Sequence, residues 1–142
     1  MTLDTLTPKQ RSERMSRVRN KDTKPEMRVR RLVHSMGYRY RLHAPSLPGQ
    51  PDLAFPSRRK VIFVHGCFWH RHDDSNCHLA RLPKSRLDFW VPKLEGNKVR
   101  DREKQDKLRA LGWDVLVVWE CQIGDMLALG DRIRAFLGPR QR

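Results

Sequence analysis

The chain has 142 residues, of which 30 are Lys or Arg and 16 are Asp or Glu, so its formal net charge is +14. This excess of positive charge attracts polyanions and indicates nucleic acid as the partner, although a solvated basic surface is the ordinary alternative. Because the longest apolar run is five residues, far short of the roughly 20 that a membrane span needs, we expect a cytoplasmic, nucleoid-associated protein without a membrane segment.

The chain begins with a polar, basic segment. Thr7 and the proline after it have the spacing of a helix start, but few apolar residues follow. We therefore expect an N-terminal DNA-contacting arm or helix over 1–20, which either docks on something else or stays free. Residues 21–142 have the length of one compact domain. A second capping signal at 23–26 begins a helix that ends at Gly37.

Two apolar stretches predict a β-hairpin. Residues 52–55 and 60–64 have the composition of strands, and a proline and a serine lie in the turn between them. Before them, 38–43 alternates apolar and polar side chains, as a half-exposed strand does. From 66 to 84 no periodicity remains, and a loop of this length needs support other than apolar packing.

The second half of the chain alternates helices with one strand. A helix opens at Ser85 and is disturbed at Pro92, and a charged helix follows over 96–111. The run 113–119 is a strongly apolar strand, and 126–137 forms a closing amphipathic helix. This order of elements predicts an α/β domain.

Three cysteines are too few and too scattered for a disulfide framework, and their histidine neighbours indicate a metal ion instead. Cys67, His72 and Cys77 lie in the irregular segment, and Cys121 follows the apolar strand. One histidine and three thiolates make a complete tetrahedral zinc set, which would pin the long loop to the end of a distant strand. The alternative is three unconnected cysteines. The histidine ligand also has alternatives in the same segment, namely His70 and His78.

A carboxylate and two imidazoles gather around the predicted hairpin. Asp52 opens one strand and His65 ends the other, so both can reach the same edge of the sheet. A carboxylate there can hold Mg²⁺, and the main-chain carbonyl of Val64 can add a second oxygen. His65 and His70 are candidates to move a proton or to hydrogen-bond a phosphate. The ordinary alternatives are turn capping for the aspartate and packing or surface roles for the histidines.

Two further acids and three aromatic residues complete the candidate site. Glu26 can instead cap its helix, and Asp101 can instead lie on an exposed charged face. Phe68 and Trp69 stand in a polar segment with no apolar face to join, and Trp90 lies on the following helix. Aromatic side chains of this kind stack on bases or wedge between them, whereas core packing is the ordinary alternative.

These motifs together resemble those of the very-short-patch repair (Vsr) DNA mismatch endonucleases. The resemblance extends from about Arg11 to Leu137 and depends on several separated blocks in the same order. The blocks are 47–52 (LPGQPD), 61–70 (VIFVHGCFWH), 89–90 (FW) with Asn97 and 100–102 (RDR), and 111–113 (LGW) with 118–121 (VWEC). An ordered set of this kind is more specific than a single short motif.

The resemblance implies a restriction-endonuclease-like fold, in which a central mixed sheet is flanked by helices. It implies an enzyme that uses Mg²⁺ to nick one DNA strand on the 5′ side of the thymine in a T:G mismatch, the product of 5-methylcytosine deamination. It also implies a structural zinc ion. We expect mismatched double-stranded DNA and other mismatch-repair proteins as partners, and a monomer as the simplest arrangement for cutting one strand.

Carried onto this chain, the resemblance assigns Mg²⁺ binding to Asp52 and to the main-chain carbonyl of Val64. It makes His70 the general acid or base and His65 a phosphate contact. Metal-bound waters would be held by two outer acids, Glu26 and Asp101. The zinc ligands would be Cys67, His72, Cys77 and Cys121. The DNA contacts would be Phe68, Trp69 and Trp90 from the major groove, Met15 from the minor groove, and Asn97 near the mismatch.

The chain departs from the family pattern after His72, because the next cysteine comes later than in the usual His-x-Cys spacing. Two other functions fit the same composition. One is a non-catalytic, zinc-dependent DNA-binding module, and the other is a restriction-type nuclease that cuts correctly paired sites in both strands. Nicking of a T:G duplex but not of the matched duplex separates the mismatch enzyme from both.

Overall fold

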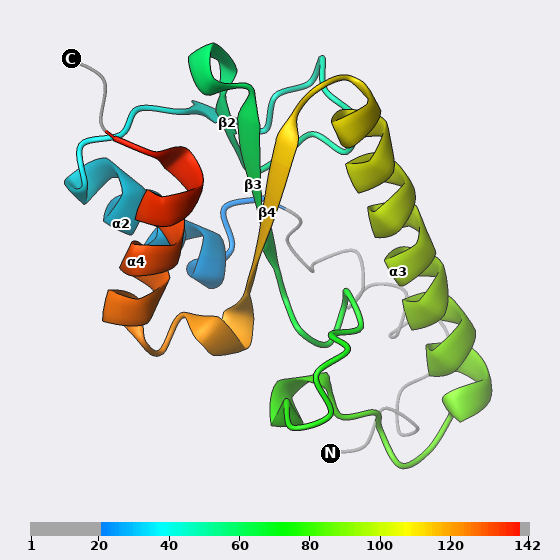
Figure 1. Cartoon of the computed structure of the whole chain (residues 1–142). Helices are drawn as coiled ribbons and strands as arrows, with labels where there is room; N and C mark the ends of the chain where they lie inside the picture. Colours follow the sequence, from blue (N-terminus) through cyan, green and yellow to red (C-terminus); the bar gives the residue numbers. More distant parts are fainter. Residues whose placement is uncertain (1–20, 140–142) are drawn as a thin grey trace.

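The computed structural model describes residues 21–139, in which a four-stranded mixed sheet lies between helices (Figure 1). The strand order is β1-β2-β3-β4; α2 and α4 cover one face of the sheet, and α3 covers the other. The strands are β1 (Arg41–Leu42), β2 (Leu53–Phe55), β3 (Lys60–His65) and β4 (Asp114–Trp119). The α-helices are α2 (Lys24–Ser35), α3 (Leu87–Ala110) and α4 (Met126–Leu137), and the short 3₁₀ helices are η2 (Pro56–Arg58), η3 (His78–Ala80) and η4 (Glu120–Gln122). The predicted α/β class is confirmed.

Two predictions are limited by the part of the chain that the structure describes. The N-terminal arm over 1–20, with Met15, lies outside the described residues. Within 21–139, no helix is both long and apolar enough to cross a bilayer.

The start of α2 follows from its sequence. The side chain of Thr23 accepts a hydrogen bond from the Glu26 N–H at 3.3 Å, and Pro25 lies in the first turn, where its missing N–H costs nothing. Val29 and Val33, one helical turn apart, are fully buried against the rest of the core. The capping signal and the apolar spacing therefore both identify this helix correctly.

The strands bring two distant segments to one edge of the sheet. β2 and β3 form the expected antiparallel hairpin, with η2 as the turn. β3 then pairs in parallel with β4, so that His65 lies opposite Trp119 at the end of both strands. Every residue of β3 after the first is buried, as expected for an inner strand of a sheet covered on both faces. The segments that follow His65 and Trp119 therefore leave the sheet side by side.

Apolar side chains pack on both faces of this sheet. The larger cluster, between the sheet and the α2–α4 pair, includes Val33, Ile62 and Ile133. The smaller cluster, between the sheet and α3, includes Val61 and Leu108. Neighbouring residues of β3 thus contribute to opposite layers. Each fully buried aliphatic side chain stabilises the fold by about 2 kcal/mol, which makes β3 the rigid centre from which the site extends.

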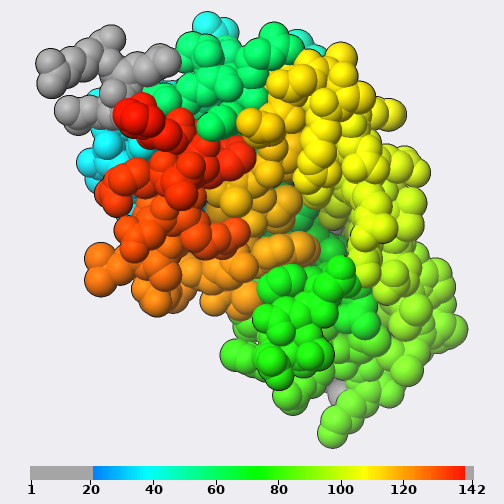
Figure 2. Space-filling model, viewed as in Figure 1, coloured from blue at the N-terminus to red at the C-terminus, as the bar shows by residue number. Residues whose placement is uncertain are grey.

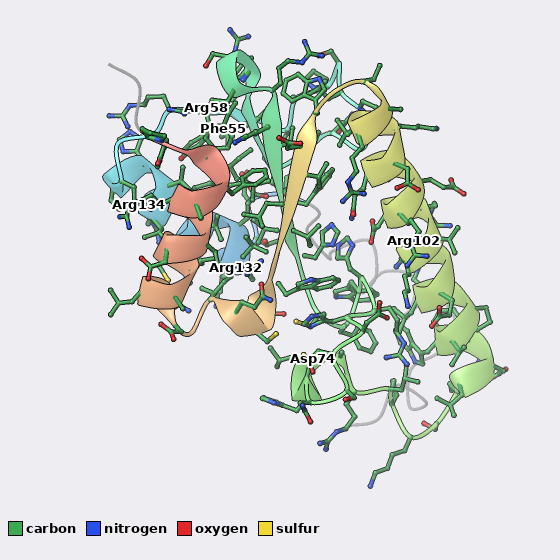
Figure 3. All side chains as sticks on the ribbon, viewed as in Figure 1. Phe55, Arg58, Asp74, Arg102, Arg132 and Arg134 are labelled. Carbon is green, nitrogen blue, oxygen red and sulfur yellow. The ribbon has the colours of Figure 1, made fainter. Side chains whose placement is uncertain are left out.

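The C-terminal end of α4 is held by two basic side chains from the β2–β3 hairpin. Arg58 donates to the carbonyl of Leu137 at 2.9 Å, and Lys60 donates to that of Phe136. Figure 3 shows Arg58 at this end of the helix. Cations here pair with the free carbonyls of the last turn and offset the negative end of the helix dipole. These contacts fix α4 against the sheet.

Two elements differ from the sequence prediction. The strand expected over 38–43 is reduced to the two residues of β1, because β1 is an edge strand and its neighbour β2 has only three residues. The two helices expected around Pro92 are one continuous helix, α3. Pro92 lies early in α3, so its missing N–H removes one hydrogen bond near the helix start. Burial of Trp90 and Leu94 on either side of it offsets that loss.

Candidate active site and metal centre

An open cleft of about 840 Å³ lies where β3 ends. Its walls come from α2, the start of β2, the segment after β3, and α3. Five residues singled out in the sequence line this cleft: Glu26, Asp52, His65, His70 and Asp101. We call it the acid–histidine cleft. Val64 and Trp69 also line it, so the structure brings the acids, the imidazoles and one aromatic residue of the candidate site to a single place.

Asp52 is held beside the end of β3 by the main chain. The Val64 N–H donates to Asp52 Oδ2 at 2.7 Å. Burial raises the pKa of Asp52 from 3.8 to about 7; the Val64 hydrogen bond opposes this rise, and the neighbouring carboxylate of Glu26 adds to it. The two carboxylates repel each other in a partly buried wall of the cleft, and a bound divalent cation would relieve this repulsion.

Glu26 is almost completely buried, with 1% of its surface exposed. Its Oε2 lies 3.0 Å from both Arg30 Nη1 and His43 Nε2. Its Oε1 accepts a hydrogen bond from the Asp22 N–H at 3.2 Å. A capping role explains only the last contact. Sequence reasoning missed Arg30 and His43. Arg30 could have been found from its i,i+4 spacing to Glu26 on the predicted helix, whereas the position of His43 in the chain gives no such signal.

His70 and Asp101 form a pair between the segment after β3 and α3. His70 Nδ1 lies 2.6 Å from Asp101 Oδ2. Asp101 is half-buried in this pair, so it does not belong to an exposed charged face. In a pair of this kind the carboxylate fixes the tautomer and the orientation of the ring, and Nε2 is the atom that exchanges a proton.

His65 lies against His70, with 3.9 Å between ring centroids and 5° between ring planes. Burial, with a smaller contribution from the nearby His70, lowers the pKa of His65 to about 3. At neutral pH the ring is therefore uncharged. Among the described residues its buried Nδ1 has no hydrogen-bond partner, which leaves one unsatisfied polar atom at the base of the cleft.

The four expected zinc ligands meet beside the cleft. One ligand atom from each of Cys67, His72, Cys77 and Cys121 lies within 4.8 Å of the others, and we call this group the cysteine cluster. Cys67 follows the end of β3 and Cys121 follows the end of β4, so the parallel pairing of the strands brings them together. His72 Nδ1 is 3.6 Å from Cys121 Sγ, and the Cys121 N–H donates to Cys67 Sγ at 3.4 Å. Three thiols and an imidazole fit a tetrahedral structural metal.

The alternative histidines lie elsewhere. His70 is paired with Asp101, and His78 is exposed at the start of η3. His72 instead stacks on Trp119, with 4.1 Å between centroids, and Trp119 also contacts His65 edge-on at 5.2 Å. The indole therefore lies between the cysteine cluster and the acid–histidine cleft. In Figure 2 the green segment after β3 meets the orange surface of η4, the two segments that carry the cysteines.

The aromatic residues form one edge-to-face group. The ring centroids of Phe68, Trp69 and Trp90 are 5.1, 5.4 and 5.9 Å apart. Phe68 and Trp69 are half-buried, whereas Trp90 is 3% exposed and packs beneath them from α3. Asn97 donates from Nδ2 to the Trp69 carbonyl at 2.9 Å, and its Oδ1 accepts from Arg100. The side chain of Asn97 thus holds the backbone of the aromatic segment.

Comparisons with known proteins identify the family of this chain. The family model of DNA mismatch endonuclease Vsr matches residues 3–76. Type II nicking enzyme V.XorIIP of Xanthomonas oryzae pv. oryzae is 54% identical over 136 residues, which cover 96% of this chain and 98% of that protein. Type II nicking enzyme V.NmeAIP of Neisseria meningitidis is 36% identical over 130 residues, or 92% and 91% of the two chains. DNA mismatch endonuclease Vsr of Escherichia coli is 42% identical over 113 residues, or 80% and 70%. These matches show that the chain is a nuclease and that it belongs to the Vsr family of DNA mismatch endonucleases.

Proposed function

We propose that this protein is a Mg²⁺-dependent DNA endonuclease that nicks one strand on the 5′ side of the thymine in a T:G mismatch. The observation that carries the proposal is the convergence of Asp52, Glu26 and the His70–Asp101 pair in one cleft of a Vsr-family chain. The names of the relatives, a mismatch endonuclease and several nicking enzymes, support it. We further propose that the mixed sheet is the core of a restriction-endonuclease-like fold.

The donor set of the cleft fits Mg²⁺, which prefers carboxylate and carbonyl oxygens and keeps several waters. Asp52 and the main-chain carbonyl of Val64 would hold the ion, and Glu26 and Asp101 would hold its waters. When bound, Mg²⁺ neutralises charge that develops on the scissile phosphate. Glu26 is preorganised for this role, because Arg30 and the rest of its surroundings fix both of its oxygens.

The histidines would divide the remaining chemistry. His70 would exchange a proton through Nε2 while Asp101 holds Nδ1, and His65 would hydrogen-bond the phosphate as a neutral ring. Cations for the DNA backbone are already present, since Lys21, Lys24 and Lys104 line the same cleft.

We propose that the cysteine cluster holds one structural zinc ion. The 66–86 segment has only one short regular element, η3, and most of its residues between 72 and 79 are exposed. An ion bound by Cys67, His72, Cys77 and Cys121 would fasten this segment to η4. Metal analysis of freshly purified protein should find about one zinc per chain, in line with the four-ligand closed site. Freshly purified protein that contains no zinc would contradict the assignment.

Phe68 and Trp69 would insert into the duplex from the major groove, with Trp90 supporting them and Asn97 near the mismatch; Met15 would approach from the minor groove. A mismatched pair costs less to unstack than a matched one, so insertion itself discriminates. We also propose that residues 1–20 form a DNA-contacting arm and that 21–142 form one domain. The protein would act as a monomer, together with other mismatch-repair proteins, and would be cytoplasmic and associated with the nucleoid.

The test uses two duplexes of one sequence, one with a T:G mismatch and one fully paired, with each strand labelled separately. We expect a single nick 5′ to the mismatched thymine, dependent on added Mg²⁺, and no cleavage of the paired duplex. Equal cleavage of both strands in both duplexes would identify a restriction-type nuclease. Binding without cleavage under all conditions would identify a non-catalytic DNA-binding module.

A further inference from the structure

His43 contacts two residues of the cleft, Glu26 through its ring and Asp52 through the main chain. Its ring Nε2 lies 3.0 Å from Glu26 Oε2, and its main-chain N–H donates to the carbonyl of Asp52 at 3.2 Å. The side chain is 15% exposed and lines the cleft. One residue therefore links α2, which carries Glu26, to the start of β2, which follows Asp52.

The backbone of His43 is specialised for this position. The residue follows β1 directly and has φ +46°, in the left-handed region that side chains other than glycine seldom adopt. Strain of this kind persists where surrounding contacts determine it, and such sites are often functional. At His43 the pairing of β1 with β2 has ended, and the imidazole ring reaches Glu26 on α2.

Two other hydrogen-bond partners of Glu26 come from α2 and from the residues just before it. Arg30 is shared between two acids, because its Nη1 lies 2.6 Å from Asp22 Oδ1 as well as 3.0 Å from Glu26 Oε2. The Asp22 N–H approaches Oε1, the other oxygen of Glu26. His43 thus approaches Glu26 from the β2 side of the cleft, where the side chain of Asp52 also lies beside Glu26.

We propose that His43 is a positioning residue of the nicking reaction, whose ring N–H fixes Glu26 relative to Asp52 so that the two acids can share a hydrated divalent cation. The proposal rests on the Mg²⁺-dependent function proposed above. The role requires a side chain that reaches Glu26 and donates a hydrogen bond to it, and it does not require a positive charge. A neutral amide at this position should therefore serve, whereas an apolar side chain should not.

The experiment compares the full-length wild-type protein with His43→Ala, His43→Gln and His34→Ala. His34 is an exposed histidine in the last turn of α2 and serves as the matched control. Nicking of the T:G duplex is measured against Mg²⁺ concentration and against DNA concentration. Loss of an outer partner of a metal site typically costs about 10–100-fold, and we expect His43→Ala to lose this much in kcat and apparent Mg²⁺ affinity, with little change in the KM for DNA.

We expect His43→Gln to recover most of this loss and His34→Ala to behave as wild type. An unchanged rate and Mg²⁺ dependence in His43→Ala would overturn the proposal. Equal losses in the Ala and Gln variants, accompanied by equal drops in melting temperature, would show a role in folding alone and would overturn it as well.

A second measurement separates this inference from the proposed function. Binding of Mn²⁺ alone, titrated calorimetrically into each purified protein, needs no DNA. Weaker Mn²⁺ binding by His43→Ala, restored in His43→Gln, would support the positioning role. Failure of the wild-type protein to cut the T:G duplex would count against the proposed function and not against this role. Equal Mn²⁺ affinities in all four proteins would overturn the positioning role.

Discussion

The acid–histidine cleft and the cysteine cluster lie at the same edge of the sheet but are held in different ways. In the cleft, protein groups fix each acid: the Val64 N–H holds Asp52, Arg30 holds Glu26, and Asp101 is paired with His70. In the cysteine cluster, the buried Cys67 has a main-chain N–H as donor, while Cys121 and much of the supporting segment are exposed. Contacts within the protein thus hold the cleft in place, whereas the proposed zinc ion would hold the cysteine cluster together.

The largest expected effect is a loss of nicking activity on substitution of Asp52, a change that should affect the cleft and leave the cysteine cluster intact. Asp52→Asn keeps the size of the side chain and an acceptor for the Val64 N–H but removes the charge that would hold the proposed Mg²⁺. Loss of a direct ligand should exceed the roughly 100-fold cost of losing an outer partner, so nicking of the T:G duplex should fall by more than that. The zinc content should stay at the wild-type level. A variant that nicks at the wild-type rate would contradict the role of Asp52.

The second effect concerns the cysteine cluster. Cys121→Ser removes one of the four proposed zinc ligands, and loss of a structural metal is among the changes that cost several kcal/mol. A loss of about 3 kcal/mol corresponds to about 10 °C in melting temperature for a chain of this size. Calorimetry and metal analysis should show both losses together. Ser75→Ala, an exposed change in the same segment, should leave both unchanged, and a stable, zinc-free Cys121→Ser protein would contradict the account.

The third effect is a dependence of stability on pH. The pKa of Asp52 is about 7 in the folded protein and 3.8 when unperturbed, so the folded state binds more protons between these values and loses stability as the pH rises towards 7. The full shift would correspond to about 4 kcal/mol, and we expect about half because Asp52 is only partly buried. Without Mg²⁺, Asp52→Asn should therefore be more stable than wild type by about 2 kcal/mol at pH 8.

The same comparison at low pH provides the control. Near pH 4 the Asp52 carboxyl is largely protonated in the folded protein, so the advantage of Asp52→Asn should nearly disappear. Urea unfolding at the two pH values measures this difference. An advantage of equal size at both pH values would show that the buried charge of Asp52 is not its cause.

The smallest effect concerns the aromatic group. Asn97→Ala removes the hydrogen bond to the Trp69 carbonyl, a contact of about 1 kcal/mol. We expect about fivefold weaker preference for the T:G duplex over the paired duplex in competition binding, with non-specific binding unchanged. Val99→Ala, an exposed neighbour on α3, is the matched control. Equal weakening on both duplexes would mean that Asn97 does not act through the aromatic group.

Local patterns were sufficient for the elements that carry the site. The cap at Thr23, the β-branched run of β3 and the apolar run of β4 identify their elements without tertiary information. The sequence also indicated that Cys67 and Cys121 would meet, because with one histidine and Cys77 they complete a tetrahedral zinc set. The continuous helix α3 was missed, since the local effect of Pro92 is overridden by packing that no local pattern contains.

The partners of the acids were less accessible to sequence reasoning. Glu26 has an ordinary place in a capping motif, and nothing near it in the chain shows that it is buried. His43 lies 17 residues away from it in sequence and directly follows β1, a strand of only two residues that packing defines. Contacts of this kind arise from the way β1, β2 and α2 are brought together, so they emerge only in three dimensions.

The most direct test of the two-site account is anomalous scattering from crystals of zinc-loaded protein soaked in Mn²⁺, a heavier substitute for Mg²⁺. We predict two separate peaks: zinc among Cys67, His72, Cys77 and Cys121, and manganese at Asp52. His65, His70 and Asp101 also place ligand atoms within 4.8 Å of one another. Zinc bound by that group, with no metal among the cysteines, would contradict the account.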